Sequence, residues 1–244
     1  MGVDDTADRL EQLRAALRDV GTLKPVRVEL ATSGVTYWID RPDDTDLLLD
    51  AVVDDPEQNL PYWSEIWPSG VALADAISAD PSPVVGRRVL ELGCGIGITA
   101  IAALRAGCEL VVSDYADGAL RLCQLNCLIN TSSEPQRIQF NWRDPSLEFI
   151  RLAGDGFPVV LAADVLYERR DIAPLLELLA RIVAPGGTLW LAEPGRHVAR
   201  QFVERAVAEG WVVVEERRDE GPWPDAKDAG VKVTVRQLQR PAEE

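Results

Sequence analysis

The segment 89–97, which reads Val-Leu-Glu-Leu-Gly-Cys-Gly-Ile-Gly, constrains the fold of this chain more than any other. Apolar β-formers lead into an acidic residue and then into glycine at every second position. A helical stretch, 98–106, follows, and a second apolar run ends at Asp114. Strand, glycine-rich turn, helix and strand with a terminal acid make the first half of a nucleotide-binding βαβ unit. Since glycine lacks a Cβ, such a turn lets a ligand approach the backbone closely.

The spacing of the glycines excludes two common kinds of nucleotide site. A G-x-G-x-x-G dinucleotide fingerprint would need glycine at position 98, but that residue is Ile98 and the third glycine is Gly97. No G-x-x-x-x-G-K-[ST] phosphate loop occurs either. A turn that uses glycine for geometry alone is the alternative, and the strand, helix and acid at the expected offsets argue against it.

The pattern Glu91-x-Gly93-x-Gly95-x-Gly97 resembles motif I of the class I S-adenosylmethionine (SAM) methyltransferases. The resemblance implies SAM as the cofactor. Helix N-terminal N–H groups after the turn can meet the carboxylate of SAM. Glu91 and Asp114 fall at the carboxyl ends of neighbouring strands, where ligands bind in open α/β sheets. At its position, the Asp114 carboxylate can accept hydrogen bonds from both ribose hydroxyls.

Two later segments supply further candidate contacts. Trp142 follows a predicted strand and can cover an adenine face, with ordinary core packing as the alternative. Residues 162–167, Ala-Ala-Asp-Val-Leu-Tyr, end an apolar strand in Asp164 and place Tyr167 three residues later. Asp164 can hold an amine, and the Tyr167 ring can wall a channel and bind a methylammonium through its face. Alternatively, Asp164 only caps the next helix.

Asp164-x-x-Tyr167 is similar to the D-x-x-[YF] motif of the seven-β-strand protein lysine methyltransferases. Four other segments also resemble that family, nearest the branch that methylates the β subunit of electron transfer flavoprotein. They are Pro61-Tyr62-Trp63…Ile66-Trp67-Pro68-x-Gly70, Leu125-Asn126-Cys127…Asn130, Asn141-Trp142 and Glu193-Pro194-Gly195-Arg196. Asn141 and Glu193 stand where the family has Asp, which bears little on cofactor binding.

The resemblance covers roughly positions 59–196 and carries site residues with it. It implies catalytic roles toward the acceptor for Asp164 and Tyr167, and substrate binding by Trp63, Glu193 and Arg196. The expected cofactor contacts are Trp67, Glu91, Gly93, Cys94, Gly95, Gly97, Asp114, Tyr115, Trp142 and Ala163.

From position 88 onward, apolar strands alternate with helices, which predicts a mostly parallel sheet with helices on both faces. The predicted strands are 88–92, 109–114, 137–141, 158–163 and 187–192, and the helices are 97–106, 117–129, 172–183 and 196–209. Pro185-Gly186-Gly187 is expected to turn between helix and strand. Val212–Val214 and Val231–Leu238 should pair antiparallel at the end of the chain, which resembles the seven-stranded sheet of class I methyltransferases.

The N-terminal part lacks this alternation. It predicts an amphipathic helix over 5–20, a β-hairpin over 26–39 and a helix over 71–78. We therefore expect a single Rossmann-like α/β domain with an N-terminal helix and hairpin. Residues 1–80 would form a cap with a Trp-rich segment, and residues 81–244 the SAM-binding core.

The charge of −15 over 244 residues argues against a nucleic-acid partner, because phosphate binding needs a basic patch and none is evident. Seven acidic residues between Asp43 and Glu57 are either a solvated face or a means of steering a basic partner toward the site. No apolar run approaches the roughly 20 residues that cross a bilayer. With no signal-peptide pattern at the start, we expect a cytoplasmic protein without a membrane partner.

The four cysteines form no C-x-x-C pair. Cys123 and Cys127 could suggest one edge of a metal site, but without further ligands nearby they are expected to be small buried residues. We expect no metal. The sequence thus predicts a monomeric, SAM-dependent N-methyltransferase that acts on a lysine of a protein. A small-molecule N-methyltransferase and a non-catalytic scaffold with a SAM fold are the alternatives.

Overall fold

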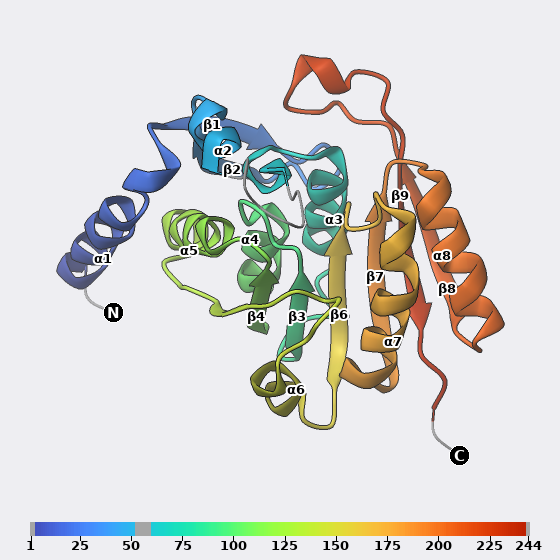
Figure 1. Cartoon of the computed structure of the whole chain (residues 1–244). Coiled ribbons are helices and arrows are strands. Elements are labelled where there is room, and N and C mark those ends of the chain that lie inside the picture. The colour runs from blue at the N-terminus through green and yellow to red at the C-terminus, as the bar shows by residue number, and fades with distance from the viewer. Residues whose placement is uncertain (1–2, 52–59, 243–244) are drawn as a thin grey trace.

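The computed structural model describes residues 3–51 and 60–242. It begins with helix α1 (Val3–Ala16), a short 3-10 helix (Arg18–Val20) and the antiparallel hairpin of β1 (Leu23–Glu29) and β2 (Thr36–Pro42). These elements, followed by the short helix α2 (Asp46–Ala51), lie at one side of the main sheet (Figure 1). The predicted N-terminal helix and hairpin are confirmed.

The main sheet has seven strands in the order β5-β4-β3-β6-β7-β9-β8. Strands β3 to β7 run parallel, while β9 pairs antiparallel with both β7 and β8. Their bounds are β3 (Arg88–Leu92), β4 (Glu109–Asp114), β5 (Gln136–Gln139), β6 (Phe157–Ala163), β7 (Val183–Glu193), β8 (Val212–Asp219) and β9 (Val233–Gln239). The predicted Rossmann-like α/β sheet with its antiparallel C-terminal hairpin is confirmed.

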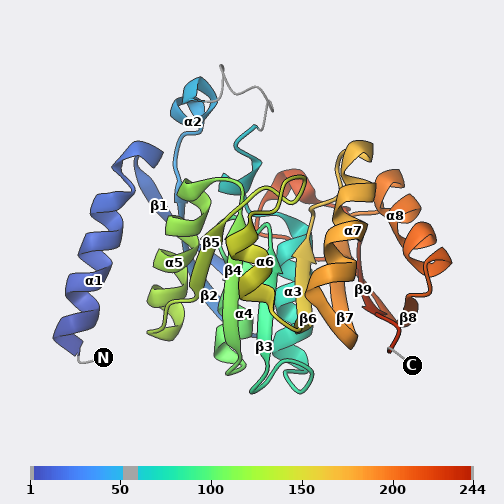
Figure 2. The same ribbon diagram turned by 60° about the horizontal axis from the view of Figure 1, so that its bottom comes forward.

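Helices cover both faces of this sheet (Figure 2). Val89 belongs to the buried cluster shared with α3 (Pro68–Ala79), α4 (Ile98–Arg105) and α5 (Asp117–Thr131). Leu90, the next residue, belongs to the cluster shared with α6 (Leu147–Ala153), α7 (Ile172–Ile182) and α8 (His197–Ala208). Because successive strand residues point to opposite faces, an almost continuous apolar run is required where both faces are buried.

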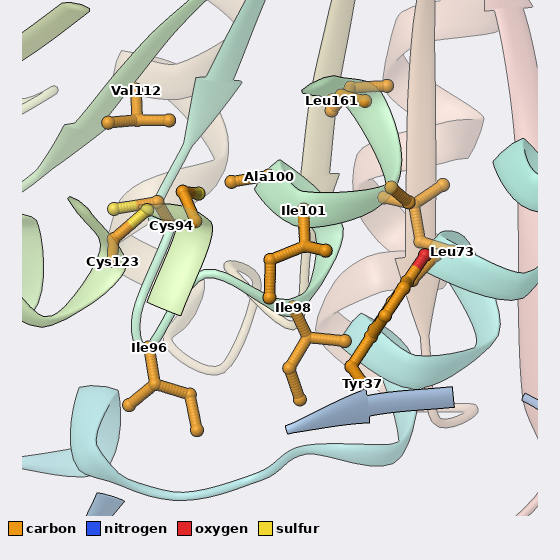
Figure 3. Packing of buried hydrophobic residues seen from close by; sticks show 14 of the residues in the cluster. Tyr37, Leu73, Cys94, Ile96, Ile98, Ala100, Ile101, Val112, Cys123 and Leu161 are labelled. Atoms are coloured by element: carbon orange, nitrogen blue, oxygen red, sulfur yellow. The ribbon is translucent and has the colours of Figure 1, made fainter. Parts of the chain in front are cut away.

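The hairpin packs onto the first of these layers. Tyr37 and Ile39 of β2 are fully buried in the same cluster as Leu73 of α3 and Ile98 of α4. Figure 3 shows Tyr37 beside Leu73 and Ile98. The Tyr37 hydroxyl lies 3.0 Å from Ser78 Oγ at the end of α3. The division into a cap over 1–80 and a core over 81–244 stays a prediction.

Two local expectations differ from the structure. Helix α6 was not predicted; Ser146 caps it by accepting a hydrogen bond from the Phe149 N–H at 3.1 Å. Pro185, Gly186 and Gly187 do not connect a helix to a strand but lie inside β7, at an irregularity in its pairing with β6. The strand tolerates them there because a bulge leaves ladder positions unpaired. Along the described residues, no helix is long and apolar enough to cross a membrane.

Candidate functional site

The glycine-rich turn connects β3 to α4, and each of its glycines has a positive φ: +66° at Gly93, +48° at Gly95 and +91° at Gly97. A Cβ at Gly95 would stand 3.1 Å from the Trp63 carbonyl oxygen, and one at Gly97 would stand 2.8 Å from Cys123 Sγ. The alternating glycines are therefore needed both for backbone conformation and for close packing against Trp63 and α5.

Asp114 ends β4, the strand that runs parallel beside β3. Its carboxylate accepts hydrogen bonds from the backbone N–H groups of Gly95 and Ala116, each at 3.0 Å. Burial raises the pKa of Asp114 to about 6, although these hydrogen bonds oppose the shift. A carboxylate has about four lone-pair sites, so Asp114 can hold the turn and still accept hydrogen bonds from a ligand.

A pocket opens at the carboxyl ends of the parallel strands, next to Gly93 and Asp114. Ten residues singled out from the sequence line it: Trp63, Trp67, Gly93, Gly95, Asp114, Tyr115, Trp142, Ala163, Asp164 and Tyr167. Leu60, Tyr62, Ala116 and Val165 complete the lining and were not among the predicted site residues. The structure thus gathers side chains from both halves of the predicted site into one cavity.

Three of the predicted cofactor residues, Glu91, Cys94 and Gly97, line a smaller adjoining hollow instead. Glu91 is 2% exposed, and its Oε2 finds no partner among the described residues. Burial raises the pKa of Glu91 well above its ordinary value. A carboxyl group with an unpartnered oxygen, beside the glycine turn, has capacity left for a polar ligand.

Asp164 follows β6 and adopts a left-handed backbone conformation, with φ of +55°. Its side chain is only 8% exposed. Arg196 donates to Oδ1 through Nε and lies 3.0 Å from the same oxygen through Nη2. Burial raises the pKa of Asp164, and the Arg196 guanidinium opposes this rise. Because Asp tolerates the left-handed region better than most residues, the chain can turn here and present the carboxylate to the pocket.

Glu193 ends β7 and holds Arg196 in place. Its Oε2 accepts hydrogen bonds from the backbone N–H groups of Gly195 (2.6 Å) and Arg196 (3.0 Å), while its Oε1 accepts from Arg236 Nη1 (2.6 Å). Glu193 is buried, and neither it nor Arg196 is among the described residues that line the pocket. Glu193 therefore contacts Arg196, Arg196 contacts Asp164, and of these three residues only Asp164 lines the pocket.

An aromatic wall closes one side of the pocket. Tyr62 meets both Tyr167 and Trp67 edge-to-face, with ring centroids 6.0 and 6.1 Å apart. The Trp67 Nε1–H donates to the Tyr62 carbonyl oxygen at 2.7 Å. Burial raises the pKa of Tyr167 to about 12, so its phenol is neutral near pH 7. Tyr62 joins the wall from the Pro-Tyr-Trp segment, which was the only sequence signal that pointed to it.

Trp142 also lines the pocket, and a hydrogen bond from its indole to a buried carboxylate holds it in place. Its Nε1–H donates to Asp171 Oδ1 at 3.3 Å, and Arg143 Nε donates to the same oxygen at 2.6 Å. Asp171 is fully buried at the start of α7. Its part in orienting Trp142 was not predicted, because nothing in the sequence links two positions 29 residues apart.

The cysteines and the described acidic residues form no metal site: among residues 3–51 and 60–242, no group of three or more His, Cys, Asp or Glu could hold an ion. Cys94, Cys123 and Cys127 are free and buried, as expected for Cys123 and Cys127. Figure 3 places Cys94 of the glycine turn beside Cys123 of α5. Burial raises the pKa of Cys94 and Cys127, which keeps both as unreactive thiols.

The pocket's residues fit a nucleoside. Asp114 offers a carboxylate at the end of β4, and Trp142 offers a ring face. At Gly93 a Cβ would stand 3.0 Å from Val165 Cγ1, so a side chain there would disturb the pocket lining. A ligand bound here would meet Asp164 and Tyr167 at its other end.

Comparison with known proteins gives a consistent result. Residues 57–207, more than half of the chain, match the family model described as lysine methyltransferase. The electron transfer flavoprotein beta subunit lysine methyltransferase of Danio rerio is 32% identical over 138 residues, which is 56% of this chain and 51% of the relative. The human histone-arginine methyltransferase METTL23 is 27% identical over 113 residues, or 46% of this chain and 58% of the relative. The chain thus spans roughly half the length of these relatives.

Among solved structures, the N-methyltransferase NodS from Bradyrhizobium japonicum, in complex with S-adenosyl-L-homocysteine, shares 18% identity and a TM-score of 0.55. The match covers 82% of this chain and all of NodS, and at this identity it concerns the fold alone. The family predicted from the sequence is confirmed. The chain belongs to the lysine methyltransferase family.

Proposed function

We propose that this protein transfers a methyl group from SAM to the side-chain amine of a lysine in a protein substrate. The observation that carries the proposal is the single pocket that joins the glycine turn and Asp114 to Asp164 and Tyr167. Membership of the lysine methyltransferase family supports the choice of acceptor.

The cofactor half of the site is assigned to the turn and the strand ends around it. Asp114 would accept hydrogen bonds from the ribose hydroxyls, and Trp142 would cover the adenine. Glu91 and the turn's backbone N–H groups, in the adjoining hollow, would meet the amino-acid end. When bound there, SAM supplies a methyl group that its sulfonium has already activated, so the protein needs mainly to position the acceptor.

In the acceptor half, Asp164 would hold the amine while Tyr167, Tyr62 and Trp67 wall the channel. Only a neutral amine has the lone pair that attacks, but an anionic carboxylate favours the ammonium form. The Arg196 guanidinium, bound to Oδ1, offsets part of that charge and leaves Oδ2 to orient the amine. The aromatic faces stabilise the methylated cation that forms. The proton lost by the lysine passes to water.

A basic protein segment is the acceptor that the surface charge favours. Asp43, Asp44, Asp46 and Asp50 of the acidic run are exposed, while Asp54, Asp55 and Glu57 lie outside the described residues. Near the channel, Glu193 and Asp228 add negative charge that acts on Asp164. These acidic side chains would attract lysine-rich sequence and repel acidic segments.

The test is a methyl-transfer assay with isotopically labelled SAM and a desalted extract of the source organism, with mass spectrometry of the products. Label on a protein, located to methyllysine, is the expected result. Label that appears only when the small-molecule fraction is restored would replace the proposal with a small-molecule N-methyltransferase. SAM binding without transfer to either fraction would favour the non-catalytic alternative.

SAM affinity is expected to depend on pH through Asp114. Its pKa is about 6, so the carboxylate is ionised above pH 7 and can accept from both hydroxyls. As the pH falls through 6 it protonates, and affinity should drop by up to about tenfold per pH unit. Calorimetry at pH 5, 6 and 7.5 measures this.

Asp114→Asn is the matched control for that titration. At pH 7.5 it should bind SAM more weakly by about 1.5–3 kcal/mol, the usual scale for a hydrogen bond to a charged group. It should also show a flat profile between pH 5 and 7.5. A profile of the same shape in wild type and variant would assign the pH dependence to another group.

Trp142→Ala is expected to weaken SAM binding by about 1–3 kcal/mol, the range found when a ring that stacks on a base is removed. Trp142→Phe keeps a ring face but cannot donate to Asp171, so it separates stacking from hydrogen bonding. The proposed role requires Phe to retain most of the affinity. Equal affinity in wild type and Trp142→Ala would leave Trp142 as a packing residue only.

The expectations of a monomer, a cytoplasmic location and no nucleic-acid or membrane partner stay predictions. Sedimentation of the purified protein with and without SAM would measure the first of them.

A further inference from the structure

Two asparagines of α5 pair with the outer edge of β2. Asn126 Oδ1 accepts from the Asp40 N–H at 2.8 Å, and Asn126 Nδ2 donates to the Asp40 carbonyl at 2.9 Å. Asn130 repeats the arrangement on Trp38, with 2.9 Å for the N–H and 2.8 Å for the carbonyl. Each side-chain amide therefore takes the place of one residue of a neighbouring strand.

The spacing explains why two asparagines four apart can do this. Four residues of an α-helix rise by about 6 Å, and two residues of a strand advance by about 6.6–6.8 Å. Trp38 and Asp40 are alternate residues of β2, so their N–H and C=O groups point to the same side, away from β1. This edge of the hairpin thus has hydrogen-bond partners on a helix instead of on a third strand.

Each asparagine makes one further bond: Asn130 Nδ2 donates to the Asn126 carbonyl oxygen within α5 at 2.7 Å, whereas Asn126 reaches a different segment. Its Nδ2 also donates to the carbonyl of Ile96, at 2.8 Å. Ile96 lies between Gly95 and Gly97 in the glycine turn, and Asn126 is completely buried. One side chain therefore joins the hairpin to the backbone of the turn that lines the cofactor site.

Arg41, which follows Asp40 in β2, connects the hairpin to the acceptor side of the pocket. Arg41 pairs with Asp225 at 2.8 Å, in the loop between β8 and β9, and lies 3.6 Å from Glu65. Glu65 belongs to the segment between Trp63 and Trp67, both of which line the pocket. Strand β2 thus contacts the glycine turn through Asn126 and two segments near the channel through Arg41.

We infer that Asn126 is a positioning residue that couples docking of the hairpin to the conformation of the glycine turn, so that SAM binding tightens β2. The inference rests on the proposed function for its ligand. Ordering the turn fixes the Ile96 carbonyl, which fixes the Asn126 amide and with it the edge of β2. By reciprocity, loss of the link should weaken SAM binding by the same factor by which SAM tightens the hairpin.

Hydrogen exchange of the wild-type protein, with and without saturating SAM, tests the coupling. Amides of residues 36–41 should exchange several-fold more slowly with SAM, relative to β8 at the far edge of the sheet. Calorimetry is done first, because a protein that does not bind SAM would contradict the proposed function and not the coupling. SAM binding with unchanged exchange of residues 36–41 relative to β8 would overturn the coupling.

Asn126→Ala and Asn130→Ala form a matched pair, since both loosen β2 but only the first loses the Ile96 bond. Asn126→Ala should bind SAM roughly three- to tenfold more weakly, the scale of one net hydrogen bond, and lose the SAM-dependent protection of β2. Asn130→Ala should exchange faster at β2 yet keep SAM affinity within about twofold and retain the protection. Equal loss of affinity in both variants contradicts the inference. If Asn126→Ala does not unfold cooperatively in urea, the wild-type exchange decides.

Discussion

Replacing Asp164 by alanine is expected to reduce methyl transfer at least about a hundredfold, the scale on which a misplaced reacting group lowers a rate. SAM affinity should stay within about twofold, because Asp164 lies at the acceptor end of the pocket. The loss should appear in kcat rather than in binding of the cofactor, the pattern of a group that acts in orienting the reacting amine. Single-turnover transfer and calorimetry measure the two quantities.

Asp164→Asn is the sharper control for this prediction. Asparagine tolerates the left-handed backbone at φ +55° better than alanine does, so it removes the charge with little added strain. It should be nearly as inactive as Asp164→Ala while unfolding at the wild-type urea concentration. Full activity in Asp164→Asn would remove the acceptor role and leave only the SAM fold supported.

Replacing Gly97 by alanine is expected to destabilise the protein by about 2–5 kcal/mol and to abolish measurable SAM binding. The left-handed conformation at φ +91° costs a non-glycine residue about 1–2 kcal/mol. The new Cβ would also stand 2.8 Å from Cys123 Sγ and 3.0 Å from Cys123 Cα, and overpacking of a core adds about 1–3 kcal/mol. Relief requires α5 to move away from the turn.

Gly34→Ala separates these two contributions. Gly34 has φ +69° in the hairpin turn, but a Cβ there meets nothing within 4 Å. It should therefore show only the backbone cost of about 1–2 kcal/mol and keep SAM affinity. Urea unfolding of both variants gives the difference. Equal destabilisation would mean that contact with Cys123 contributes nothing.

The sheet and most of its helices could be predicted because their signals are local. The apolar runs of β3, β4 and β6, and the periodic helices between them, are visible without tertiary knowledge. Helix α6 was missed because a seven-residue helix offers too few turns for a period to emerge. Pro185 to Gly187 favour a turn in any sequence, but the neighbouring β6 draws them into a bulged strand.

The residues of the candidate site also divide into those that local sequence signals reveal and those that depend on tertiary contacts. Residues tied to a strand end, such as Gly93, Asp114 and Asp164, could be placed from sequence because the carboxyl ends of parallel strands share one edge. Arg196 and Glu193 could be named by resemblance. The sequence could not show that Glu193 holds Arg196 and that Arg196 holds Asp164, because these contacts depend on how β7 and β9 meet. Asp171 behind Trp142 depends on contacts between distant segments that no spacing rule records.

Covering β2 with asparagines has a consequence for how the chain folds. The bonded pairs Asp40–Asn126 and Trp38–Asn130 are 86 and 92 residues apart in sequence. Their hydrogen bonds can therefore form only after α5 has been synthesised and has folded. Contacts of such long separation form late. Until then β2 presents unpaired N–H and C=O groups that can recruit a strand from another molecule. Soluble yield during expression should therefore fall more for Asn130→Ala than its modest effect on the native state would suggest.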